Sequence, residues 1–480
     1  MAKRIGSLQP YQPTSDNPFD AVKAAHLLNR AGFGGTEAEI KRVLELGPDE
    51  AVEWLLDFPD AGAEEQSQED VPDLSSVDGY AKSYREAQQL MRGMTDEERI
   101  AYRQKLMRAN REAVVATGAW WVKRMAMGPA PLQEKLTLFW HGHFTTSARD
   151  ERSAMLLWQQ NELLRRQAAG NFAQFVSDIS HDPAMLDYLN NQQNRKQHPN
   201  ENYARELMEL FTLGIGNYSE QDIKEAARAL TGWGHDGDKF VFRKYDHDNG
   251  EKQFFGRKGN LDGQDVIDAI LDHRACAPYI AGRLWSFFAY EDPEPDVTAA
   301  MGAVLRQSKW ELRPALRAMF TSQPFYSAKA IGTQIKSPVQ LVVGTSRMLG
   351  MEPPVGRGFG DALAKMGQIP LDPPNVKGWP GGRAWINTST LFVRYNTATR
   401  MIGGQPGDGR RIRGGVDVTL ASFPGEPYEI VDAWVARLIQ RPIESEKRRV
   451  LIESLGEKPN DEVVKKMVQL IVSTPDYQLC

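Results

Sequence analysis

Several features that would place a protein in a familiar class are scarce in this sequence. Only two of its 480 residues are cysteines, Cys276 and Cys480, which excludes a disulfide framework. No segment approaches the roughly 18 consecutive apolar residues that a membrane-spanning helix needs, so we expect no membrane span and a soluble protein. Lysine and arginine (58) nearly balance aspartate and glutamate (63), and the net charge is −5. Because positive charge is not in excess, nucleic acid is not an expected partner.

The motifs of common catalytic machinery are also missing. The sequence holds no Walker loop, no dinucleotide-binding glycine fingerprint, no His-Glu-x-x-His, no Gly-x-Ser-x-Gly and no paired-cysteine zinc ribbon. Nucleotide-driven and serine-hydrolase mechanisms are therefore disfavoured. The amino-terminal residues 1–7 are basic but precede no apolar stretch, so we expect no secretory signal and, by default, a cytoplasmic location.

Signals for helices are abundant. Apolar residues make up 41% and charged residues 25% of the chain, as in ordinary globular proteins. Thr36 and Thr95 are typical helix N-caps, and residues 239–242 and 253–255 are the main strand signals, which we expect to form one small hairpin. The sequence predicts a mainly α fold: a large multi-helix array around one core, with at most a small β-hairpin and long Gly/Pro-rich loops.

The predicted organisation is one integrated domain in five segments. These are an N-terminal helical segment (1–60), an acidic connector (61–76), a helical core that carries the site (77–350), a long loop region packed on that core (351–426) and C-terminal helices (427–480).

Two histidines follow a predicted helix over residues 131–140. Side chains at i and i+2 point to the same side of an extended segment, and Gly142 permits such a switch. His141 and His143 would then offer two nitrogens to one Zn²⁺, Fe²⁺ or Mn²⁺ ion. The alternative is a helix end at which the imidazoles stack on Trp140 and Phe144 and bond local carbonyls.

A polar helix is predicted over residues 201–213. Asn200 is a good N-cap and Glu201 suits the first turn. Four residues share its polar face: Asn202, Arg205, Glu206 and Glu209. The pairs Glu201–Arg205 and Arg205–Glu209 have i,i+4 spacing, and a carboxylate beside Arg205 would stay ionised. The alternative is a solvated, salt-bridged helix face.

Two further regions carry polar candidates. Arg228 lies on a predicted helix over residues 219–230, and His247, Asp248 and Lys252 lie in a turn-forming stretch after it. His247 or Asp248 could complete a metal site with the two earlier histidines, and the alternative is a plain Asx turn.

The last region is the Gly/Pro-rich loop over residues 372–385. It contains Asn375, Lys377 and Trp379, and its two tryptophans, Trp379 and Trp385, could pave a sugar- or peptide-binding floor. The alternative is that the tryptophans close the core under the loop.

Five segments together resemble one family. They are residues 25–34 (AHLLNRAGFG), 138–144 (LFWHGHF), 199–214 (PNENYARELMELFTLG), 226–233 (AARALTGW) and 373–382 (PPNVKGWPGG). This closely resembles the large bacterial family catalogued as domain of unknown function 1800, over about residues 20–477. The family brings no established reaction or cofactor. Many members carry export signals and are encoded beside a sulfatase-like family, which the resemblance implies as a partner.

The residues that match the family pattern are mostly polar, which indicates a site more than a packing scaffold. The leading hypothesis is a metal-dependent hydrolase. Its predicted metal ligands are His141, His143, Glu201, His247 and Asp248. Its predicted catalytic residues are Arg205, Glu206, Glu209 and Arg228. Its predicted substrate-binding residues are Asn200, Asn202, Lys252, Asn375, Lys377 and Trp379. The alternatives are a metal-free carboxylate-pair enzyme such as a glycosidase, and a non-catalytic carbohydrate- or protein-binding or assembly protein.

Overall fold

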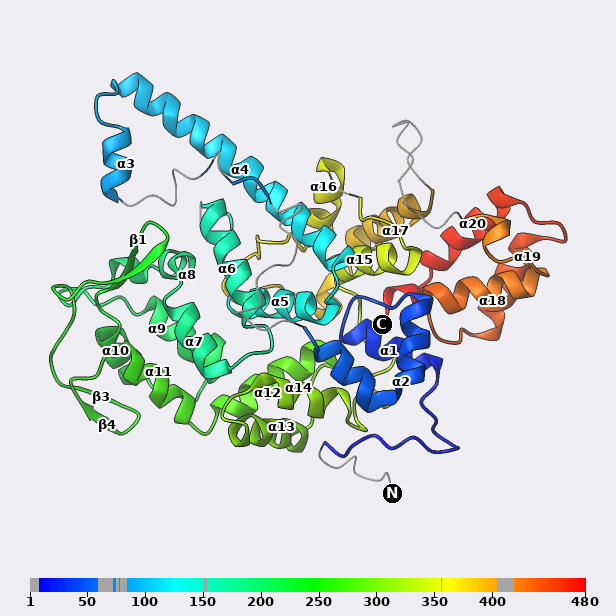
Figure 1. Ribbon diagram of the computed structural model, residues 1–480, viewed down its shortest axis with the longest axis horizontal. Coiled ribbons are helices and arrows are strands. Elements are labelled where there is room, and N and C mark those ends of the chain that lie inside the picture. Colours follow the sequence, from blue (N-terminus) through cyan, green and yellow to red (C-terminus); the bar gives the residue numbers. More distant parts are fainter. Residues whose placement is uncertain are drawn as a thin grey trace.

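Helices account for most of the structure. The computed structural model describes residues 8–58, 72–74, 77, 84–150, 153–354, 356–403 and 418–480. These residues form twenty α-helices and two small antiparallel sheets of two strands each (Figure 1). The predicted mainly α fold is confirmed. In the described part of the chain, no helix has both the length and the apolar character needed to cross a membrane. The predicted acidic connector, 61–76, lies almost wholly outside the described residues.

The helices succeed one another along the chain. The first ten are α1 (Ala21–Arg30), α2 (Glu37–Leu56), α3 (Tyr84–Leu90), α4 (Asp96–Met127), α5 (Pro131–His143), α6 (Ala154–Arg166), α7 (Phe172–Ser180), α8 (Pro183–Tyr188), α9 (Asn202–Glu206) and α10 (Glu220–Ala229). The others are α11 (Gly263–Asp272), α12 (Cys276–Phe288), α13 (Pro295–Gln307), α14 (Leu312–Phe320), α15 (Pro338–Leu349), α16 (Arg357–Met366), α17 (Thr388–Gly403), α18 (Pro427–Leu438), α19 (Ser445–Leu455) and α20 (Asp461–Val472). Short 3₁₀ turns are η2 (Asn191–Gln193), η4 (Gly382–Trp385), η5 (Leu420–Ser422) and η6 (Asp476–Gln478), and η3 (Leu207–Thr212) is a π-helix.

Local signals explain where several helices begin. Thr36, Thr95 and Ser219 each form a capping box with the acidic residue three positions on. Each box provides acceptors for two backbone amides at the start of its helix, those of the cap residue and of that acidic residue. Gly47, at φ +76°, interrupts the helical backbone of α2 before Pro48.

Two expectations from the sequence are wrong in detail. Residues 239–242 and 253–255 do not pair with each other: β2 (Lys239–Phe242) pairs with β1 (Trp233–Asp236), and β3 (Lys252–Phe254) pairs with β4 (Arg257–Gly259). Each strand pairs with its nearest neighbour because a short turn costs little chain entropy. The predicted loop region 351–426 also contains helices α16 and α17, so it is not a continuous loop.

Two central helices join the halves of the molecule. In Figure 1, α5 and α15 lie at the centre, α7 to α11 on one side and α18 to α20 on the other. All twelve residues of α15 are buried. The apolar residues form two large clusters, and α5 supplies Phe139 to one and Leu138 to the other. The polar face of α9 and the end of α5 are therefore supported by the buried core.

Candidate active site

The two histidines of α5 lie inside the helix. Because α5 continues to His143, the predicted extended segment is wrong, and side chains at i and i+2 point to opposite sides of a helix. The His141 ring lies 5.5 Å from the rings of both Trp121 and Trp379. The Nε2 atom of His143 donates to the carbonyl oxygen of Phe211 at 2.9 Å.

Burial decides the protonation of these imidazoles. Both side chains are almost completely buried. Burial lowers the pKa of His141 to about 4. Burial, together with the charge of Arg283, lowers the pKa of His143 to about 3. Both rings are therefore neutral at pH 7 and serve as aromatic packing groups.

The predicted metal ligands do not meet. Within the described ranges, no group of three or more histidine, cysteine, aspartate or glutamate side chains is arranged to hold a metal ion. Glu201 pairs with Arg205, Asp248 pairs with Arg228, and His247 bonds the backbone at Thr231. These side chains do not fit a shared ion, so the metal remains a prediction with no ligand set in this part of the chain.

The polar helix begins as α9 and continues as the π-helix η3. The Oδ1 atom of Asn200 accepts the backbone N–H of Asn202 at 3.0 Å, but the N-cap position of α9 is Glu201, so Asn200 lies one residue before the predicted capping position. The side-chain amide of Asn202 donates to the carbonyl of Leu189 at 3.2 Å. Both asparagine side chains thus form hydrogen bonds with the backbone, which explains their presence without a substrate. π-helical turns are rare and often occur at functional sites.

Arg205 binds a partner that helical spacing did not predict. It forms a fork with both carboxylate oxygens of Glu220, at 2.9 and 2.8 Å, and a longer pair with Glu201 at 3.4 Å. The predicted Arg205–Glu209 pair is not formed. Arg205 therefore ties α9 to the start of α10.

Glu206 has the most unusual setting of the predicted catalytic residues. It is half-buried and makes no side-chain hydrogen bond or ion pair with any residue that the structure describes. Burial and the neighbouring carboxylate of Glu209 raise its pKa, while Lys377 and Arg205 oppose that shift. The Arg205 guanidinium, which is engaged by Glu220, thus does not hold the pKa of Glu206 at or below its ordinary value.

Tyrosines surround the two carboxyl groups, and sequence reasoning missed them. The hydroxyl of Tyr218 donates to Glu209 Oε2 at 2.5 Å. Burial, followed by the carboxylates of Asp150, Glu206 and Asp372, raises the pKa of Tyr188 to about 12. Tyr218 follows Glu209 by nine residues and directly precedes the Ser219 cap, and nothing in that pattern marks it as a neighbour of the site.

The Gly/Pro loop lies on the end of α5. Gly378 has φ +78°, and a Cβ atom there would lie 2.2 Å from the carbonyl oxygen of Gly142, so only glycine permits this approach. Trp379 is half-buried against the same helix turn, which places it partly under the loop. Asn375 caps the loop through the N–H of Lys377 at 2.9 Å. The exposed Lys377 side chain acts electrostatically on Glu206, so three predicted segments meet here.

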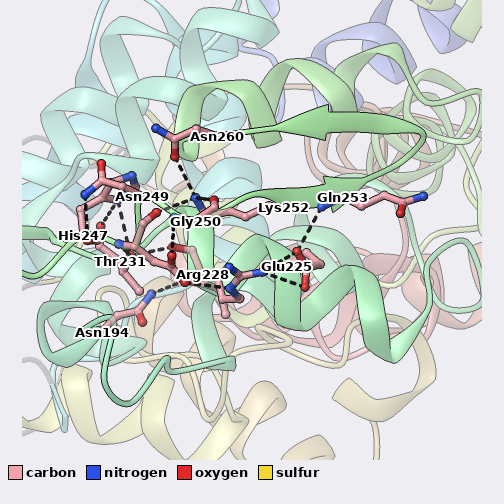
Figure 2. Close-up of polar contacts among 12 residues, drawn as sticks. Asn194, Glu225, Arg228, Thr231, His247, Asn249, Gly250, Lys252, Gln253 and Asn260 are labelled. Atoms are coloured by element: carbon pink, nitrogen blue, oxygen red, sulfur yellow. Dashed lines mark hydrogen bonds and ion pairs between the residues drawn. The ribbon is translucent and has the colours of Figure 1, made fainter.

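A second polar cluster joins α10 to β3 and to the loop that precedes β3 (Figure 2). Arg228 donates from Nε to Asp248 at 2.8 Å and from Nη1 to Glu225 at 2.9 Å. The Nδ1 atom of His247 donates to the carbonyl of Thr231 at 2.8 Å. Four predicted site residues are thus brought together: Arg228, His247, Asp248 and Lys252.

Lys252 is held entirely by protein atoms. Its ammonium group is buried and donates to the carbonyls of Asp248 and Gly250, at 2.6 and 3.1 Å, and to Asn260 Oδ1 at 3.3 Å (Figure 2). An ammonium group has three N–H donors, so none is left for a substrate. The cluster borders a polar cleft of about 520 Å³, but its charges are matched internally. The contacts of this cluster hold α10 and β3 together.

Comparison with known proteins identifies a family and no activity. The family model described as "Protein of unknown function (DUF1800)" matches residues 26–479. A search of curated proteins and a search of solved structures gave no significant match.

Proposed function

The chain belongs to the DUF1800 family, whose description assigns no activity, and we propose from the geometry that it is a hydrolase in which the carboxyl groups of Glu206 and Glu209 act as acid and base. The observation that carries this proposal is the setting of Glu206, a half-buried carboxyl without a hydrogen-bonding or ion-pairing partner among the described residues. Perturbed ionisable groups of this kind concentrate at catalytic sites.

The two carboxyl groups have different surroundings, and that difference assigns their roles. Glu206 has a raised pKa, which suits the donor of a proton to a leaving group. Glu209 accepts the Tyr218 hydroxyl hydrogen, which orients its carboxylate as a base or nucleophile. In many hydrolases, two carboxyl groups whose environments give them different pKa values act as the catalytic acid and base.

Glycosides are the substrate class that we propose. Glu206 and Glu209 are three positions apart, and the Glu209 carboxylate is close enough to raise the pKa of Glu206. Glycosidase carboxyl pairs span roughly 5–9.5 Å. Trp379 is half-buried against His141 and lies two residues after Lys377 in the Gly/Pro loop, and an aromatic face is a common platform for a sugar ring. Lys377 is exposed and acts electrostatically on Glu206, and we assign to it hydrogen bonds to a hydroxyl-rich substrate.

A panel of chromogenic aryl glycosides and aryl esters tests the proposal. Glu206→Gln and Glu209→Gln are expected to lower kcat by about 10²–10⁴-fold, the usual contribution of a positioned acid or base. Glu446→Gln is the matched control, because Glu446 forms an exposed pair with Arg449 on α19. A Glu206→Gln protein that keeps wild-type activity would overturn the assignment.

A second arm separates this mechanism from the metal-dependent hydrolase that the sequence predicts. The purified protein is dialysed against EDTA and its metal content is measured by elemental analysis. Full activity of the metal-free protein is expected. Loss of activity that Zn²⁺, Fe²⁺ or Mn²⁺ restores would favour the metal-dependent alternative instead.

A further inference from the structure

A groove far from Glu206 lies between the amino-terminal helices and α18. It encloses about 620 Å³ between α1, α2 and α18, on the opposite side of the molecule from α9 in Figure 1. Its walls are mostly apolar, and the main apolar lining residues are Val22, Ala25, Ile40, Val435, Ala436 and Ile443. That volume falls within the roughly 300–1,000 Å³ typical of small-molecule pockets.

Two guanidinium groups line this apolar groove and have no hydrogen-bonded carboxylate among the described residues, although Glu37, which also lines the groove, forms a long ion pair with one of them. Arg437 donates from Nε to the carbonyl of Met348 at 2.7 Å. Its nearest acidic partner is Glu37, at 3.9 Å, which is beyond hydrogen-bond distance. The side chain of Glu37 is 83% exposed. In the described part of the chain, Arg441 bonds one backbone carbonyl, that of Asp476, at 3.0 Å. Among the described residues, neither group has a carboxylate within hydrogen-bond distance.

The third arginine that lines the groove, Arg448, has a carboxylate partner. Arg448 forms a fork with both oxygens of Asp432, at 2.6 Å each. The lining therefore has one matched arginine and two that can accept an anion. An apolar body and one anionic head is the ligand chemistry that complements such a surface.

We propose that this groove binds a small amphipathic carboxylate, such as a medium-chain fatty acid free in solution, with its alkyl chain along α1 and α18 and its carboxylate on Arg437. Partial burial of Arg437 strengthens the attraction, since charges interact more strongly where water is excluded. Guanidinium groups without a hydrogen-bonded carboxylate favour an anion over a neutral or cationic amphiphile. This site is independent of the carboxyl pair on α9 and η3.

Calorimetric titration with octanoate, decanoate and decanol tests the proposal. Burying one methylene group strengthens binding about fourfold, so decanoate should bind about 16-fold more tightly than octanoate. Decanol should bind at least tenfold more weakly than decanoate. Arg437→Gln should weaken decanoate binding by about tenfold or more and leave decanol binding unchanged, because only the acid uses the guanidinium.

Filling the groove supplies the matched control. Ala436 is exposed on α18 and lines the groove, so Ala436→Trp should abolish decanoate binding. Ala101→Trp, at an exposed position on α4, should leave it unchanged. Thermal melts of both variants check folding. No decanoate binding, or equal binding by the Ala436→Trp protein, would overturn the proposal. Sedimentation with phosphatidylglycerol vesicles that Ala436→Trp abolishes would assign the groove to a membrane and overturn it too.

Discussion

At the scale of single residues, the buried histidines of α5 give the protein a defined response to acid. The pKa of His141 is about 4 in the folded state against an ordinary value of 6.5, so the unfolded chain binds a proton first as the pH falls. The stability that depends on neutral His141 is complete above pH 6.5 and is lost as the pH falls to about 4. The difference, 6.5 − 4, corresponds to about 3 kcal/mol.

Replacing His141 by phenylalanine should remove this dependence. Between pH 7 and pH 4, the free energy of unfolding of His141→Phe should fall by about 3 kcal/mol less than that of the wild type. Urea unfolding at each pH measures this difference. His198→Phe, at an exposed position, is the control and should change nothing. Identical acid losses in the wild type and His141→Phe would show that the His141 imidazole is not shielded from water in the folded protein.

Sequence patterns did not predict the partners that the polar residues bind. Helical spacing offered Arg205 two local partners, Glu201 and Glu209, yet its strongest partner is Glu220, fifteen positions away on another helix. Spacing along one helix contains no information on the helix that packs beside it. For the same reason the meeting of Lys377 with Glu206 was not predictable from their separate segments.

At the scale of elements, one buried carboxylate joins three helices. Glu134 on α5 accepts hydrogen bonds from Trp121 and Arg124 on α4 and from Arg165 on α6, at 2.6–3.0 Å. Burial alone would raise its pKa, but the two guanidinium groups lower it below the ordinary value. Its contribution to stability is therefore present above the ordinary carboxyl range and is lost as the pH falls below it.

Removing that carboxylate should cost far more than removing a surface one. Glu134→Gln removes the buried counter-charge of Arg165, whose other carboxylate partner, Glu162, is more exposed, and we expect a loss of about 3–5 kcal/mol in the free energy of unfolding. Glu446→Gln breaks an exposed pair and should cost less than about 1 kcal/mol. Urea unfolding at pH 7 measures both, and equal losses would contradict the joining role of Glu134.

The contact between the Gly/Pro loop and α5 can be tested with two glycines of similar backbone. Gly378 and Gly381 have φ of +78° and +72°, so alanine is strained at both. A Cβ at Gly381 meets nothing within 4 Å, whereas one at Gly378 meets the Gly142 carbonyl. Gly378→Ala should therefore cost about 1–3 kcal/mol more than Gly381→Ala and should speed hydrogen exchange in the last turn of α5. Equal effects would show that the loop does not rest on α5.

Element boundaries followed capping chemistry where that signal is local. Thr36, Thr95 and Ser219 all begin helices as the sequence predicts. Helix α17 was missed because glycine and proline dominate the residues before it, although Asn387 caps it through the N–H of Thr390 at 2.9 Å. The extension of α5 to His143 was missed because Gly142 favours a break, and packing against Trp379 overrides that preference.

At the scale of the whole molecule, two apolar clusters share their central elements. The turn after α1 supplies Ala31 to one cluster and Phe33 to the other, and α5 divides its residues in the same way. The predicted single integrated domain should therefore unfold as one unit. Scanning calorimetry should show one transition whose calorimetric and van't Hoff enthalpies agree. Two separate transitions would divide the chain into independent domains.

The central claim is that Glu206 is a proton donor, and the protonation of its carboxyl tests that claim most directly. Protein labelled with ¹³C at the glutamate carboxyl carbons is titrated by NMR, and the Glu206 signal is identified by its absence in Glu206→Gln. We predict that Glu206 titrates above 4.5, because burial and Glu209 disfavour its charged form. A midpoint at or below 4.5 would contradict the proton-donor role.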